Sequence, residues 1–190
     1  APYSLAAKQL RFGNESDLNG YYAVVEAGFE RNPPTTELKQ GMEVLREYVD
    51  KQGQVLSSVK VGDEVLVRLR FRALDRSAIS NVALTDLLPG GFEPVINERA
   101  QGEPPKDKNK PNLRIGSSSG WGAEYADVRE DRVVLYGTVD TSMSEFVYRI
   151  RATNAGTFIV PPAYGESMYE RSIQARSAAG KITVERVAKR

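Results

Sequence analysis

The sequence contains no histidine and no cysteine among its 190 residues. These absences exclude Ser-His-Asp and Cys-His catalytic units, a thiol nucleophile and zinc sites of the usual ligand types. Disulfides are excluded as well, so the hydrophobic core must stabilise the fold. Only carboxylates, Ser, Lys and Tyr remain for acid–base or nucleophilic chemistry, and an enzyme is therefore a weaker hypothesis than a binding domain.

A strong charge of one sign and a long apolar run are missing too. The 26 Lys and Arg residues balance 25 Asp and Glu residues, whereas nucleic-acid-binding domains usually carry a marked basic excess. No stretch approaches the ~20 apolar residues that cross a bilayer, and the first residues lack the basic flank and apolar run of a signal peptide. We therefore expect no nucleic-acid partner, and no membrane contact through this stretch of sequence.

Alternation of apolar and polar residues is the dominant pattern. In residues 65–72 the odd positions hold Val, Val, Leu and Phe, and arginines occupy positions 68, 70 and 72. Residues 146–151 repeat the pattern, with apolar residues at even positions and arginines at 149 and 151. A period of two is typical of strands with one buried and one exposed face. We expect these arginines to face solvent and to pair with carboxylates across strands.

Turn signals divide the chain into further short strands. Strands are expected at residues 42–49, 81–86, 124–129, 132–136, 157–160 and 181–187. Hairpins are expected around residues 13–17 and where residues 154–156 join the strand of 146–151 to that of 157–160. Because amphipathic helical windows are absent, the pattern predicts an all-β fold, an antiparallel β-sandwich.

Two proline-containing stretches interrupt the strands. The double proline Pro33-Pro34 predicts a domain boundary, which divides the chain into residues 1–33 and 34–190. Residues 101–122 form a loop that is long for a compact domain. Its lysines lack interleaved aromatic residues apart from Trp121, a composition typical of a solvated loop rather than a nucleic-acid site.

Acidic pairs are the main candidates for acid–base chemistry. Glu130 with Asp131, and Asp86 with Glu93, could in principle act as carboxylate pairs. A hairpin tip and a charge at a strand edge explain them better, because spacing alone does not indicate a shared cleft. Asn14-Glu15-Ser16-Asp17 offers few oxygen ligands and matches no known calcium-loop spacing. We therefore expect no catalytic residue, no metal site and no cofactor.

The pair Met168-Tyr169 is more informative. It follows Pro161-Pro162 and precedes Ile173-Gln174-Ala175-Arg176, which places it on a connection between strands. A thioether beside an aromatic ring on a loop is typical of a surface that docks on another. The alternative is that both side chains tuck into the core of their own domain, and the pattern leaves both interpretations open.

Five segments resemble the bacterial alpha-2-macroglobulins. They are VALTDLLPGGFE at 82–93, DVREDRVVLYG at 127–137, RATNAGTF at 151–158, ESMY at 166–169 and RSAAGKITV at 176–184. The resemblance extends over about residues 40 to 187 and is specific because the segments occur in order. The part resembled is the C-terminal macroglobulin-like domain, a sandwich of immunoglobulin-like or fibronectin-III-like architecture. Residues 1–33 are similar to the terminal strands and linker of a preceding CUB-like domain.

The resemblance implies a non-enzymatic part of a large protein that traps proteases and serves in bacterial defence. It implies a periplasmic location, with attachment to the inner membrane only through a lipid anchor elsewhere in the parent. The implied partners are neighbouring domains and, through the whole protein, target proteases. The alternative is a partner-binding β-sandwich of a multiprotein extracytoplasmic complex, which would use the arginines or the long loop.

In family members that carry a reactive thioester, the C-terminal domain packs on the thioester domain and shields the bond from water. By resemblance, Met168 and Tyr169 correspond to that shield. This chain cannot contain the thioester itself, because it has no cysteine. A second bacterial branch lacks the thioester, so the implied role applies only to a parent that has one; in the other branch the loop would be an interdomain contact.

Overall fold

The computed structural model describes residue 9 and residues 11–23, 32–95 and 121–186. The chain divides into two compact units, residues 1–31 and residues 32–190. Residues 11–23 form bends and no strand; the Asn14 side-chain oxygen accepts a hydrogen bond from the Ser16 amide at 3.2 Å, as in an Asx turn. The other residues of the expected N-terminal hairpin lie outside the described residues, and the CUB-like assignment of residues 1–33 stays a prediction.

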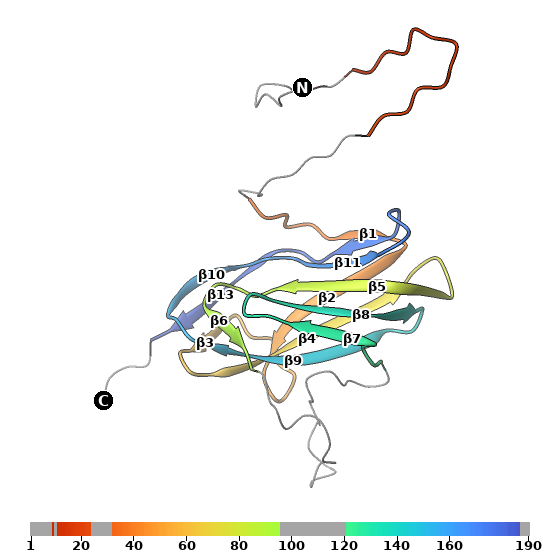
Figure 1. Ribbon diagram of the computed structural model, residues 1–190. Coiled ribbons are helices and arrows are strands. Elements are labelled where there is room, and N and C mark those ends of the chain that lie inside the picture. Colours follow the sequence, from red (N-terminus) through yellow and green to blue (C-terminus); the bar gives the residue numbers. More distant parts are fainter. Residues whose placement is uncertain (1–8, 10, 24–31, 96–120, 187–190) are drawn as a thin grey trace. The chain divides into compact units, whose positions relative to one another are not determined.

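Thirteen strands form the described part of the second unit (Figure 1). They are β1 Leu38–Gln40, β2 Met42–Val49, β3 Ser58–Lys60, β4 Glu64–Ala73, β5 Ala78–Leu87, β6 Phe92–Pro94, β7 Tyr125–Val128, β8 Arg132–Asp140, β9 Ser144–Ala152, β10 Gly156–Val160, β11 Ala163–Ser167, β12 Gln174–Arg176 and β13 Gly180–Glu185. Within the described ranges, no helix has the length and apolar character needed to cross a membrane.

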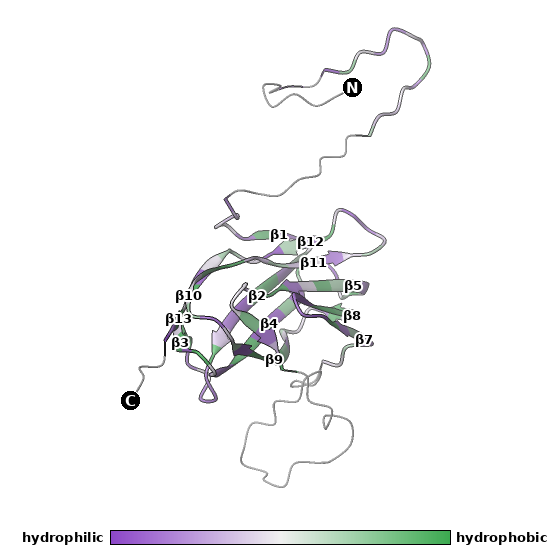
Figure 2. Ribbon diagram, turned by 60° about the vertical axis from the view of Figure 1, so that its left-hand side comes forward, coloured by the Kyte–Doolittle hydropathy of each residue, from purple (hydrophilic) through white to green (hydrophobic). Residues whose placement is uncertain are grey.

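The strands form three sheets. A six-stranded sheet has the order β1-β12-β11-β5-β8-β7, and a four-stranded sheet has the order β2-β4-β9-β6. Strand β2 contacts β11 and β12, and β4 contacts β8, so these two sheets lie face to face. A smaller sheet, β10-β13-β3, lies at one end, on the left in Figures 1 and 2. The expected antiparallel β-sandwich is confirmed, with one parallel pair, β13 with β3, that the sequence pattern did not indicate.

Alternation along the strands builds the core. Val65, Val67, Leu69 and Phe71 of β4 are at most 1% exposed, as are Phe146 and Ile150 of β9. Figure 2 shows the alternation as changes between green and purple along the strands. Side chains from all three sheets join one cluster, and burying each large apolar side chain contributes about 1.5–3 kcal/mol. The core therefore makes this unit stable without disulfides.

The opposite face of the four-stranded sheet carries the expected arginines. We call Arg68, Arg70, Arg72, Arg149 and Arg151 the arginine face. Glu47 pairs with Arg68 at 2.8 Å and Arg70 at 3.1 Å, Glu43 with Arg72 at 2.6 Å, and Glu64 with Arg149 at 3.2 Å and Arg151 at 2.7 Å. The prediction that these arginines pair with carboxylates across strands is confirmed.

The hairpin expected between residues 146–151 and 157–160 is wrong. Strand β9 pairs with β4 and β6, whereas β10 pairs with β13 in another sheet. The amide of Thr153 instead bonds to the carbonyl of Gly91 at 2.9 Å, so the chain crosses between sheets at this point. A Cβ on Gly91 would lie 2.2 Å from the ring of Phe158. Only glycine allows this close approach.

Candidate interaction site

Residues 168–173 connect β11 to β12 and form what we call the Met-Tyr loop. The side chains at its start are exposed: Met168 is 53% exposed and Tyr169 is 81% exposed. Both residues lie on a connection between strands, as predicted. Neither residue belongs to the core of this unit. Their role as a shield stays a prediction.

Hydrogen bonds close the Met-Tyr loop into a compact turn. The amide of Ser167 donates to the carbonyl of Ile173 at 3.1 Å, and the amide of Ile173 donates to the carbonyl of Glu170 at 3.0 Å. The amide of Glu170 donates to the hydroxyl oxygen of Ser167 at 3.3 Å. Because both ends and the middle are bonded, little backbone freedom remains to be lost on docking.

The neighbouring strand β5 holds the start of this loop through an unusual backbone position. The pairing of β5 with β8 contains a bulge between Ile79 and Val82. Asn81 lies in this bulge in the left-handed region, with φ of 54°, a conformation that asparagine tolerates better than most residues. Its carbonyl accepts a hydrogen bond from the amide of Met168 at 2.9 Å. The bulge thus positions the backbone of Met168.

An ion pair holds the middle of the loop. Arg76 lies on the connection between β4 and β5, and two of its guanidinium nitrogens donate to the two carboxylate oxygens of Glu170 at 2.7 Å each. We call this the surface ion pair, because its side chains are 49% and 43% exposed. The hydroxyl of Ser172 also lies 3.2 Å from the Glu170 carboxylate.

Shallow hollows flank the Met-Tyr loop on two sides. One is lined by Glu166, Met168, Arg171 and Ile173, among others, and the other includes Tyr169. Within the loop the Ser167 hydroxyl oxygen accepts from the Glu170 amide, and the Ser172 hydroxyl donates to the Glu170 carboxylate. Such a surface can exclude water from a group pressed against it.

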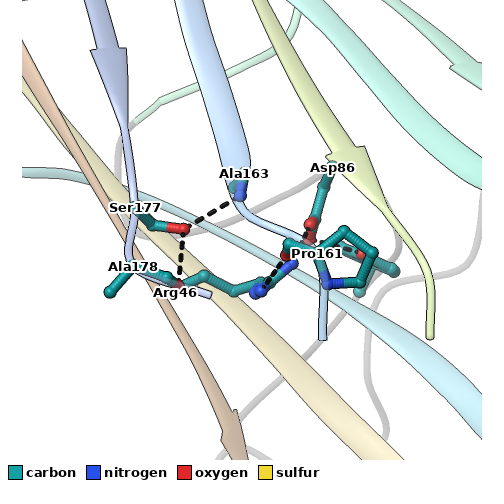
Figure 3. Close-up of polar contacts among 7 residues, drawn as sticks. Arg46, Asp86, Pro161, Ala163, Ser177 and Ala178 are labelled. Carbon is teal, nitrogen blue, oxygen red and sulfur yellow. Dashed lines mark hydrogen bonds and ion pairs between the residues drawn. The ribbon is translucent and has the colours of Figure 1, made fainter. Parts of the chain in front are cut away.

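A second polar cluster lies inside the sandwich and is shown in Figure 3. Arg46 of β2 reaches across to Asp86 of β5, with 2.5 Å between Nη1 and Oδ1, and we call this the core ion pair. The hydroxyl of Tyr148 on β9 donates to the other Asp86 oxygen at 2.7 Å. A second Arg46 nitrogen donates to the carbonyl of Pro161. The cluster therefore joins both large sheets to the segment that leads into β11.

Burial and charge shift the pKa values in this cluster. Burial opposes the charged form of Arg46, but Asp86, Tyr48 and Tyr148 together more than offset it, so the arginine pKa is raised. Burial raises the pKa of Tyr148 well above its ordinary value, and the adjacent Asp86 charge raises it further. Burial likewise raises the pKa of Tyr48, which lies beside Arg46. Both phenols thus remain neutral over the physiological pH range.

The core ion pair was not predicted, although the sequence contains its signal. In β2, Arg46 shares the inward face with Val44 and Tyr48, and in β5, Asp86 shares it with Leu84. Opposite charges at inward positions of two strands require each other as partners, because an unpaired buried charge is very unfavourable.

The acidic residues considered for catalysis lie in different places, and Asp86 and Glu93 are not brought together. Asp86 is buried in the core ion pair, whereas Glu93 is exposed on β6 of the other sheet. Glu130 and Asp131 are exposed at the turn between β7 and β8, where Asp131 pairs with Arg132 at 2.5 Å. Within the described ranges, no group of three or more metal-ligating side chains gathers. The lysines of the long loop lie outside the described residues.

Comparison with known proteins identifies the class of this sandwich. Over residues 41–171 the sequence matches the family described as the bacterial alpha-2-macroglobulin MG10 domain. An alpha-2-macroglobulin homolog from Yersinia pestis is 39% identical over 188 residues, which are 94% of this chain and 9% of the relative. The fold is thus a macroglobulin-like domain.

Solved structures agree. The native conformation of Escherichia coli alpha-2-macroglobulin matches with a TM-score of 0.69 and 27% identity, over 83% of this chain and 10% of that protein. Salmonella alpha-2-macroglobulin reacted with methylamine matches with a TM-score of 0.67 and 28% identity, over 83% of this chain and 10% of that protein. The chain belongs to the bacterial alpha-2-macroglobulin family, and it spans about a tenth of the length of these relatives.

Proposed function

We propose that this chain is the non-catalytic C-terminal domain of a bacterial protease-trapping inhibitor, and that it works by packing on neighbouring domains of its parent. Family membership supports this proposal. The observation that carries it is the exposure of Met168 and Tyr169, 53% and 81%, on a turn fixed by hydrogen bonds and an ion pair. Exposed apolar side chains on a turn whose backbone is fixed are characteristic of interaction sites.

In a parent that holds a thioester, the Met-Tyr loop shields that bond. A thioester persists only where water and amines are kept away, and a thioether beside an aromatic ring provides an apolar cover. Where the parent has no thioester, the same loop serves as an interdomain contact. In either case, target proteases bind the full-length protein and not this domain by itself.

The arginine face gives less support to the alternative of a partner-binding module. Its five arginines already pair with Glu43, Glu47 and Glu64 across strands. A partner would have to compete with these carboxylates for the arginines. The exposed side chains of Met168 and Tyr169 carry no charge, and no such competition arises there. The loop is therefore the favoured contact.

The experiment treats the full-length parent with methylamine, which attacks the thioester carbonyl, and measures the rate at which the free thiol is released. Met168→Ala and Tyr169→Ala should each speed the reaction, at least about tenfold for Tyr169, the factor that corresponds to about 1.4 kcal/mol. Met143→Ala and Tyr125→Ala are matched controls, because these side chains are also exposed, at 42% and 64%. Unchanged rates for both loop variants would remove the shield assignment.

A parent that releases no thiol even when denatured would leave only the interdomain contact. Amide hydrogen exchange of residues 168–173 then tests that contact, by comparing the 190-residue chain with the full-length parent. Slower exchange in the parent is expected. Equal exchange in both would contradict packing through this loop.

We also propose that the parent is periplasmic, is attached to the inner membrane only through a lipid anchor elsewhere in its sequence, and serves in bacterial defence. The support is the family, since trapping of foreign proteases requires access to them. Fractionation of cells that produce the full-length parent tests the location. Recovery in the cytoplasmic fraction would contradict it.

A further inference from the structure

The tip of the Met-Tyr loop has little support of its own. Among the hydrogen bonds of the described residues, none involves Tyr169. Its ring is also 81% exposed, so packing does not hold it. The conformation of Tyr169 therefore depends on the residues on either side of it, Met168 and Glu170.

Both of these neighbours are held by one segment from a distant part of the sequence. The carbonyl of Asn81 binds the amide of Met168, and Arg76 binds the carboxylate of Glu170. Arg76 and Glu170 are 94 positions apart, and Arg76 lies where the chain passes from the four-stranded to the six-stranded sheet. The loop is thus clamped from outside, on both sides of Tyr169.

The geometry at Glu170 favours an orienting role. Both carboxylate oxygens accept from different nitrogens of one guanidinium at 2.7 Å, the two-point arrangement that fixes direction as well as distance. The backbone of Glu170 bonds on both sides within the turn, through its amide to Ser167 and through its carbonyl to Ile173. A rotation of Glu170 would therefore move the turn that presents Tyr169.

We propose that Arg76 is a positioning residue that holds Met168 and Tyr169 in the conformation that docks, through its two-point ion pair with Glu170. This inference rests on the proposed function, because it assigns a cause to the presentation of the same loop. In this role Arg76 acts through Glu170. The pair is exposed, so its removal leaves the core of the sandwich intact.

The first test measures amide exchange of residues 168–173 in the 190-residue chain. Arg76→Gln and Glu170→Gln should each speed exchange about 1.5- to 5-fold, the range that the free energy of an exposed ion pair gives. Arg132→Gln is the matched control, since it breaks another exposed arginine–carboxylate pair, at the β7–β8 turn. It should leave exchange in the loop unchanged.

Charge reversal separates an ion pair from a loss of side-chain contact. Arg76→Glu should open the loop more than Arg76→Gln, and the double variant Arg76→Glu with Glu170→Arg should restore slow exchange. In 1 M salt, charges are screened within about 3 Å. The exchange rate of the wild-type loop should then approach that of Arg76→Gln, while the exchange rate of Arg76→Gln should change little. Equal exchange in wild type and Arg76→Gln, or no restoration by the double variant, would overturn the proposal.

The second test repeats the methylamine reaction in the full-length parent. Arg76→Gln should speed it by a factor similar to its effect on exchange, and less than Tyr169→Ala does. If Tyr169→Ala has no effect, the proposed shield fails, while the exchange results still decide whether Arg76 positions the loop. If Tyr169→Ala speeds the reaction and Arg76→Gln changes neither exchange nor reaction, only the present inference is wrong.

Discussion

The core ion pair and the surface ion pair use the same two chemical groups in opposite surroundings. The side chains of Arg46 and Asp86 are 3% and 1% exposed, and those of Arg76 and Glu170 are 49% and 43% exposed. In the core, desolvation is so unfavourable that each charge needs a partner. At the surface, water can replace either partner. The first pair therefore affects whether the sheets pack, and the second only how one loop is held.

Removal of one member of the core ion pair is expected to have the largest effect. Asp86→Ala leaves the Arg46 charge buried without its partner and should lower the free energy of unfolding by about 3–5 kcal/mol. Urea denaturation of the 190-residue chain measures this change. Asp131→Ala is the control, because it breaks an exposed pair and should cost at most about 1 kcal/mol. Equal losses in both variants would remove the distinction between the pairs.

The hydroxyl of Tyr148 is expected to come next. It donates to the Asp86 carboxylate at 2.7 Å, and hydrogen bonds to charged groups are worth about 1.5–3 kcal/mol. Tyr148→Phe removes only the hydroxyl and should destabilise by about that amount in the same denaturation experiment. In the double variant with Asp86→Ala, Tyr148→Phe should cause little further loss of stability, because both substitutions remove the same hydrogen bond. Simple addition of the two losses would contradict this coupling.

Alkaline pH should weaken the core further. Burial raises the pKa of Tyr48 and Tyr148 in the folded state. Their contribution to the free energy of unfolding is therefore fully present below the unfolded-state pKa of about 10, and it is lost as pH rises toward the folded-state pKa. Above pH 10 the free energy of unfolding should fall by about 1.4 kcal/mol per pH unit for each such tyrosine. Denaturation between pH 9 and pH 11.5 measures the slope. Tyr148→Phe should reduce it; an unchanged slope would exclude Tyr148 as its source.

The smallest effect on global stability is expected at the surface ion pair. Arg76→Gln should change the free energy of unfolding by less than about 1 kcal/mol, even though it loosens the Met-Tyr loop. Thermal or urea denaturation measures the global change beside the exchange of loop amides. A loss as large as that of Asp86→Ala would show that Arg76 supports the whole sandwich rather than one loop.

The strands could be predicted from sequence because period-two patterning reports burial directly. Residues 65–72 and 146–151 show it plainly, and their inward and outward faces agree with the structure. The partners of each strand could not be read in the same way. β10 follows β9 closely and yet pairs with β13, because pairing depends on where the chain crosses between sheets and not on local turn residues.

The candidate site was predictable in part. Met168 and Tyr169 could be identified as residues of a connection between strands, but patterning cannot tell an exposed side chain on a loop from one that folds back. Arg76, Asn81 and Glu170 gave no signal, because their bonds join segments far apart in sequence. The Arg46 and Asp86 pair had a signal in the inward face of each strand, but recognising it requires knowing that β2 and β5 face each other.

The bulge at Asn81 and the connection that holds Arg76 have a consequence for protein engineering. An exposed turn between two strands is ordinarily a good place for an affinity tag, a fluorophore or a cysteine for labelling. An insertion at residues 74–77 would instead displace Arg76 and, through Glu170, alter the conformation of Tyr169. The β7–β8 turn, which is equally exposed and lies on other strands, is the better place to attach a reporter without disturbing the loop that it is meant to observe.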